Sequence, residues 1–127
     1  MRLHRLRFTF GRMMVAVASM AVLCAGIVCC VRTVENRLVV ENRSGQALVW
    51  VKIGLANSGP IATFHDLSEG GIETASFGIG GDDSFVLDAR LADGTKVGGN
   101  FGYVTNGFYG VRPRFVVREG GKIDFTD

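Results

Sequence analysis

The 127-residue sequence predicts an all-β fold, an antiparallel β-sandwich of immunoglobulin-like architecture with about seven or eight short strands, preceded by one N-terminal transmembrane helix. Three observations predict this class. Residues 13–31 carry no charged side chain, whereas apolar and polar residues alternate from residue 35 onward. Turn residues interrupt this alternation about every 10–13 positions, and 16 of the 18 glycines follow residue 32. The hydrophobic fraction of 47% is enough to build a packed core.

The N-terminal segment has the charge pattern of a signal anchor. Residues 1–32 contain five arginines and no acid, and four of these arginines precede the uncharged run. A helix of 19 residues is about 28 Å long, which approaches the roughly 30 Å thickness of the bilayer hydrocarbon. The positive-inside rule then predicts a cytoplasmic N-terminus at 1–12, a transmembrane signal anchor at 13–31, a linker at 32–36 and an extracytoplasmic domain at 37–127.

A cleaved signal peptide is the alternative interpretation of this segment. Cys24-Ala25-Gly26 supplies the small residues that a signal peptidase needs, but cleavage there leaves an apolar N-terminus that begins with Ile27. The length of the apolar run favours the uncleaved anchor.

All three cysteines of the chain lie in the uncharged run, namely Cys24, Cys29 and Cys30. Cysteine packs as a small hydrophobic residue, and this accounts for its presence in a membrane helix. The alternative is a homodimer through the transmembrane helix, either by a disulfide at Cys29 or Cys30 or by close packing along Ala21, Ala25 and Cys29.

Eight segments of alternating sequence follow the anchor, and each ends at a group of turn residues. In order, the predicted strands are 38–42, 47–55, 61–67, 72–79, 84–91, 96–105, 108–118 and 122–126. Asn106-Gly107 and Asp93-Gly94 are typical of two-residue hairpin turns because these residues tolerate positive φ.

Alternation also assigns the core, because successive side chains of a strand point to opposite faces. The predicted inward side chains are Ala47, Val49, Val51, Ile53, Leu55, Ala75, Phe77, Ile79, Phe85, Leu87, Ala89, Leu91, Val111, Phe115, Val117, Ile123 and Phe125.

The outer domain offers little catalytic chemistry. His65 is its one histidine, and Asp66 beside it points to the opposite face of a strand. No catalytic motif is found, and one histidine without a thiol does not make a usual zinc site. Asp82-Asp83 and Asp88 lack the regular acidic spacing of calcium loops. We therefore expect no catalytic residue, metal or cofactor.

The most distinctive stretch, residues 98–110, holds four aromatic residues and five glycines. A hairpin turn at Asn106-Gly107 would bring aromatic and arginine side chains onto one exposed strip. The predicted binding residues are this strip together with the outward-facing Trp50, namely Trp50, Phe101, Tyr103, Phe108, Arg112, Arg114 and Arg118. The alternative is a glycine bulge near Gly110, which reverses the register and places Phe101 and Tyr103 in the core.

These features predict a non-enzymatic, membrane-anchored binding module in the bacterial periplasm, on the outer face of the inner membrane. Its expected partner is a protein or a glycan of the cell envelope. Two alternatives are an immunity protein against a periplasmic toxin and a small hydrolase that uses His65. Nucleic acid is excluded as a partner, because residues 33–127 carry more acids than bases. Asn42-Arg43-Ser44 is a formal N-glycosylation sequon at a predicted turn, but the short arginine-rich leader favours a bacterial origin.

Overall fold

The computed structural model describes residues 10–33 and 35–127, and within its helix it describes the side chains of residues 13–27. The chain divides into two compact units, with the boundary after Val34. Most of the predicted cytoplasmic segment and the side chains of Cys29 and Cys30 lie outside the described residues.

The first unit contains one helix, α1 (Phe10–Thr33), which includes the whole uncharged run. The described side chains, from Met13 to Ile27, are all exposed. Ser19 satisfies its hydroxyl within the helix by donating to the carbonyl of Val15 at 2.8 Å. Among the residues that the structure describes, no helix is both long and apolar enough to cross a membrane, so the predicted transmembrane span has no structural support.

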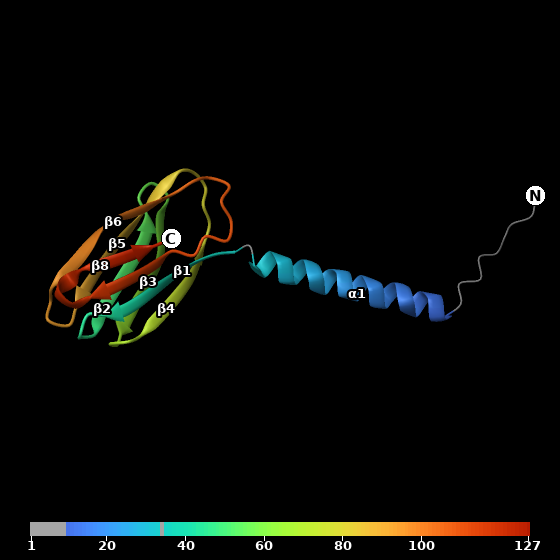
Figure 1. The fold of residues 1–127 in the computed structure, drawn as a ribbon, viewed down its shortest axis with the longest axis horizontal. Coiled ribbons are helices and arrows are strands. Elements are labelled where there is room, and N and C mark those ends of the chain that lie inside the picture. Colours follow the sequence, from blue (N-terminus) through green and yellow to red (C-terminus); the bar gives the residue numbers. More distant parts are fainter. Residues whose placement is uncertain (1–9, 34) are drawn as a thin grey trace, which may run out of the picture. The chain divides into compact units, whose positions relative to one another are not determined.

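The second unit is a sandwich of two four-stranded sheets, as predicted (Figure 1). The strands are β1 (Asn36–Arg43), β2 (Leu48–Leu55), β3 (Gly59–Leu67), β4 (Ile72–Phe77), β5 (Asp83–Leu91), β6 (Lys96–Val104), β7 (Arg114–Arg118) and β8 (Ile123–Thr126). The first sheet has the order β4-β1-β7-β8 and the second sheet the order β3-β2-β5-β6. One pair, β1 with β7, is parallel, which corrects the prediction of a wholly antiparallel sandwich.

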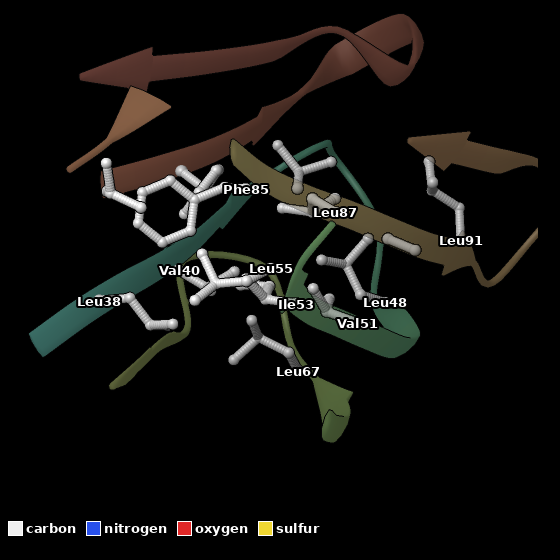
Figure 2. Packing of buried hydrophobic residues seen from close by; sticks show 14 residues of the cluster. Leu38, Val40, Leu48, Val51, Ile53, Leu55, Leu67, Phe85, Leu87 and Leu91 are labelled. Carbon is white, nitrogen blue, oxygen red and sulfur yellow. The ribbon is translucent and has the colours of Figure 1, made fainter. Parts of the chain in front are cut away.

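The core lies between the sheets and is made of alternate side chains from both (Figure 2). The four predicted inward residues of β5 are all buried, and Phe85 and Leu87 are completely inaccessible to solvent. Phe115 and Val117 of β7 are buried in the same way. The residues predicted to face inward from β4 and β8 are partly buried against this cluster.

The predicted face of the start of β2 is wrong. Leu48 is completely buried, whereas Ala47 is exposed and Val49 retains 41% of its accessible surface. The pairing of β2 with β5 shifts register between Leu48 and Trp50, and this bulge reverses the alternation. Beyond it, Val51 and the later inward residues of β2 face the core as predicted.

Buried polar side chains organise the loops of the sandwich. Asp83, at the start of β5, accepts hydrogen bonds from the backbone amides of Asn57 and Ser58, each at 3.0 Å. Asn42, near the end of β1, donates to the carbonyls of Gln46 and Leu67 at 2.8 and 2.9 Å. Asn42 is completely buried and both of its amide hydrogens are used, so the folded domain has no room for a glycan on this sequon.

The packing predicts unequal effects for two Phe→Ala substitutions in the fragment 35–127, which contains the whole core. Phe115→Ala should lower the free energy of unfolding by about 3–5 kcal/mol, because it leaves a cavity between the sheets. Phe108→Ala is the matched control: its side chain is 59% exposed, so a change within about 0.5 kcal/mol is expected. Equal losses in urea-induced unfolding would contradict this core assignment.

Candidate functional site

The structure does not bring the seven predicted binding residues onto one face. β6 ends at Val104 and β7 begins only at Arg114, and a loop without strand structure joins them. β7 pairs with β1 and β8 rather than with β6. The predicted hairpin at Asn106-Gly107 is therefore wrong, because the chain crosses from the second sheet to the first at this point.

Phe101 is partly buried and packs against the core, as the alternative interpretation predicted, but the same interpretation was wrong for Tyr103. Its ring centroid lies 5.9 Å from that of Phe115 and 6.2 Å from that of Phe125. The pairing of β5 with β6 shifts register after Phe101, next to Gly102, which has a φ of +54°. A bulge is thus present, but it lies at Gly102 rather than near Gly110. Beyond it Tyr103 points outward and is 62% exposed.

Tyr103 lies instead next to the crossing loop, which contains two other predicted residues, Phe108 and Arg112. Tyr109, which was not predicted, is also exposed in this loop. Asp82 fastens the loop by accepting a hydrogen bond from the backbone amide of Asn106 at 2.9 Å. A hydrogen bond with the Asp82 carboxylate also raises the pKa of the Tyr103 hydroxyl. We call residues 105–113, together with Tyr103, the aromatic loop.

Arg114 and Arg118 lie on the outer face of the first sheet and are engaged in ion pairs. Arg114 and Arg43 both donate hydrogen bonds to Glu41, whose side chain is only 5% exposed. Arg118 donates to Asp124, and the Lys122 ammonium lies 3.5 Å from the same carboxylate. Each of the two carboxylates thus holds two cations, which engages Arg114 and Arg118 within the sheet but leaves part of the positive charge uncompensated.

The second sheet presents a different outer face, centred on Trp50. In the strand register Trp50 lies opposite His65 on β3 and Arg90 on β5, while Lys52 lies opposite Asp88. On the other side of β5, the strand register places Lys96 of β6 opposite Arg90 and Gly98 of β6 opposite Asp88. We call this set the Trp50 surface; its members are Trp50, Lys52, His65, Asp88, Arg90, Lys96 and Gly98.

An open hollow of about 470 Å³ lies on the Trp50 surface. Trp50, Lys52, Asp88, Lys96 and Gly98 line it, together with Ala89 and Val97. The Lys52 ammonium lies 5.1 Å from the centroid of the Trp50 ring, within the range of a cation–π contact. A Cβ atom at Gly98 would lie 2.5 Å from the Asp88 carboxylate and 2.6 Å from the Leu87 carbonyl oxygen. Glycine at this position therefore allows the Asp88 side chain to lie against the backbone of β6.

The Trp50 surface is basic, although the domain as a whole is acidic. It carries three permanent cations, Lys52, Arg90 and Lys96, against the one carboxylate of Asp88. Trp50 was predicted as a site residue, but the residues around it were not. These residues point outward from four strands, and their proximity becomes visible only when the order β3-β2-β5-β6 is known.

Among the described residues no group of three or more His, Cys, Asp or Glu side chains is close enough to hold a metal ion. His65 is exposed on β3 as part of the Trp50 surface.

Comparisons with known proteins reveal the fold alone. No protein-family model and no curated protein matches the chain. A solved structure, described as the NMR structure of the protein from Eubacterium rectale, is similar with a TM-score of 0.53 and 13% sequence identity. The match covers 72% of this chain and 86% of that chain, so it supports the sandwich architecture.

The ion pairs of Glu41 predict a pH dependence of stability. Hydrogen bonds from Arg114, then from Arg43, hold the pKa of Glu41 below its ordinary value and outweigh the opposing effect of burial. Its contribution to stability is therefore full above the unfolded-state pKa and is lost as the pH falls through the folded-state pKa. Glu41→Gln should flatten the acid side of a plot of unfolding midpoint against pH, measured on the fragment 35–127.

The control for this measurement is Glu73→Gln, at an exposed position of the edge strand β4. It should leave the acid side of the plot closer to that of the wild type than Glu41→Gln does. If the two variants lose the same amount of stability across the acid range, Glu41 has no special role in holding the first sheet.

Proposed function

We propose that this protein is a non-enzymatic binding module of the bacterial cell envelope that holds an acidic glycan on the Trp50 surface. Residues 13–31 anchor it in the inner membrane, with the sandwich in the periplasm. One observation carries the proposal: the chain's sole tryptophan is only partly buried beside an open hollow on a basic sheet face.

The chemistry of the hollow matches that of a sugar chain that bears carboxylates. An indole ring provides a flat apolar area on which the apolar face of a sugar ring can pack. The Asp88 carboxylate accepts hydrogen bonds from hydroxyls, and Lys52 and Lys96 attract anionic substituents. The hollow is open rather than enclosed by the fold, so it accommodates a segment of a longer chain.

His65 lies beside Trp50 in the strand register, and we assign it to ligand contact rather than to hydrolysis. A protein partner is the competing possibility for the same surface, since aromatic and basic residues are also favoured at protein interfaces. The net charge of the Trp50 surface and its open hollow favour the acidic glycan.

The anchor rests on the sequence of the first unit. The 19 uncharged residues from 13 to 31 follow four arginines, in the order that retains an N-terminus in the cytoplasm. Apart from Ser19, the described side chains of α1 are apolar on every side of the helix, as Met13, Met14, Val15 and Leu23 illustrate. In our proposal these side chains contact the hydrocarbon of the bilayer.

The anchor predicts that the full chain, expressed in a bacterium, stays in the membrane pellet after alkaline carbonate extraction. The double substitution Val22→Arg, Leu23→Arg should release it, since each central arginine costs about 2.5–3.5 kcal/mol on insertion scales. Val22→Leu, Leu23→Ile is the matched control and should stay in the pellet. Release of the wild type, or an intact mass that lacks residues 1–26, would contradict an uncleaved anchor.

The binding proposal predicts that the fragment 35–127 binds oligogalacturonate, an acidic glycan, more tightly than neutral chito-oligosaccharide in titration calorimetry. Trp50→Ala should weaken binding of the acidic glycan at least about tenfold, as expected when a central aromatic contact is lost. Tyr109→Ala removes an exposed aromatic side chain outside the Trp50 surface and should leave the affinity within about twofold.

Equal affinities for the wild type and Trp50→Ala would place the ligand elsewhere. Binding of neither glycan by a folded fragment would contradict the proposed ligand class, and a preference for the neutral glycan would contradict the role of the lysines. Circular dichroism spectra of each variant confirm that it is folded.

A further inference from the structure

The aromatic loop contains three of the five exposed large hydrophobic residues of the sandwich. Tyr103 is 62% exposed, Phe108 59% and Tyr109 73%. The loop residues 105–113 include Arg112 and no acid. Asp82, the acid that contacts the loop, is engaged by the Asn106 amide and by Tyr103. A loop of this composition is not explained by binding at the Trp50 surface, which lies on the outer face of the second sheet.

Hydrogen bonds fasten the aromatic loop to the beginning of β1. The Val111 amide donates to the Asn36 side-chain oxygen at 3.1 Å, and the Arg37 amide donates to the Val111 carbonyl at 3.0 Å. The Asn36 side chain also donates to the Phe108 carbonyl at 3.5 Å. The loop therefore lies at the end of the sandwich where β1 begins, as its course in Figure 1 shows.

Residue 36 follows the uncharged run closely in the sequence. Five residue steps separate Val31 from Asn36, and an extended chain spans at most about 3.6 Å per residue. The covalent chain alone thus keeps Asn36 within roughly 18 Å of the last residue of that run.

We propose that the aromatic loop contacts the outer surface of the same bilayer, with Phe108 and Tyr109 inserted at the level of the lipid headgroups. This inference rests on the proposed membrane anchor. Tyrosine is enriched at the membrane–water interface because its ring is apolar and its hydroxyl is polar, and phenylalanine adds apolar area. Arg112 is exposed and presents a cation at the same end of the domain, where an anionic lipid phosphate would bind it. Arg37 is also exposed there, but its guanidinium lies 3.8 Å from the Glu35 carboxylate.

The position of the loop favours lipid over a protein partner. The short covalent tether at Asn36 holds the loop's attachment point within reach of the bilayer that the proposed anchor enters, so lipid is available to the loop at high local concentration. A loop contact with the headgroups would also set the direction in which the Trp50 surface faces.

The test uses the full chain, reconstituted in vesicles of phosphatidylcholine and phosphatidylglycerol, with Trp50→Phe as background so that one new tryptophan reports. Phe108→Trp places the probe in the aromatic loop. Ala92→Trp is the matched control, at an exposed position in the turn between β5 and β6. Lipids brominated near the headgroup end of the acyl chain quench tryptophan only on contact.

The inference predicts that brominated lipids quench the loop probe at least about twofold and leave the Ala92→Trp probe unquenched. Equal quenching of both probes, or of neither, in protein that resists carbonate extraction would overturn the loop contact while the anchor stands. Protein that carbonate removes from the vesicles would overturn the anchor, and the loop contact with it. Crosslinking of a photoreactive group at Tyr109 to protein rather than to lipid, in intact cells, would also overturn it.

Discussion

Five phenylalanine rings between the two sheets hold this sandwich together. Phe77, Phe85, Phe101, Phe115 and Phe125 come from β4, β5, β6, β7 and β8, so each contributing strand anchors its sheet to the other. Neighbouring centroids are 5.1–6.2 Å apart, the range in which aromatic pairs attract beyond simple burial. All three cysteines precede residue 35, so the domain depends on this packing without a covalent bridge.

The packing of the core decides which side chains remain for function. Because each strand turns alternate residues inward, the outer faces carry the polar ones. On the outer face of the first sheet the charged side chains form ion pairs with one another. Glu41 binds two arginines, and Asp124 contacts Arg118 and Lys122. The second sheet carries three cations and one carboxylate around a half-buried tryptophan, and the open hollow beside this tryptophan makes it the candidate binding face.

Alternation in the sequence was sufficient to predict the eight strands, the two-sheet class and most of the core. It failed where the backbone departs from regular pairing. The bulge between Leu48 and Trp50 reverses the start of β2. The bulge at Gly102 separates Phe101, which is partly buried against the core, from Tyr103, which is exposed. The amino acids at these two bulges do not by themselves require a bulge there. The register of β2 and β6 therefore depends on their partner strands.

The candidate site was predictable only in part, because the sequence does not reveal which strands lie side by side. Trp50 stood out as the chain's one tryptophan, but Lys52, Asp88 and Lys96 are ordinary surface residues until β2, β5 and β6 are placed side by side. The predicted aromatic and arginine strip assumed that strands adjacent in sequence pair with one another. Residues 105–113 instead cross between the sheets and leave Phe108 in a loop and Arg114 in an ion pair.

The central claim is that the outer face of the second sheet is the binding face. Amide chemical-shift mapping of the ¹⁵N-labelled fragment 35–127 during titration with oligogalacturonate tests it most directly. The account predicts the largest shifts at the Trp50 indole and at the amides of Lys52, Asp88, Lys96 and Gly98, with small shifts at Glu41, Arg114 and Arg118. Shifts confined to the first sheet or to the aromatic loop, or no shifts at all, would contradict it.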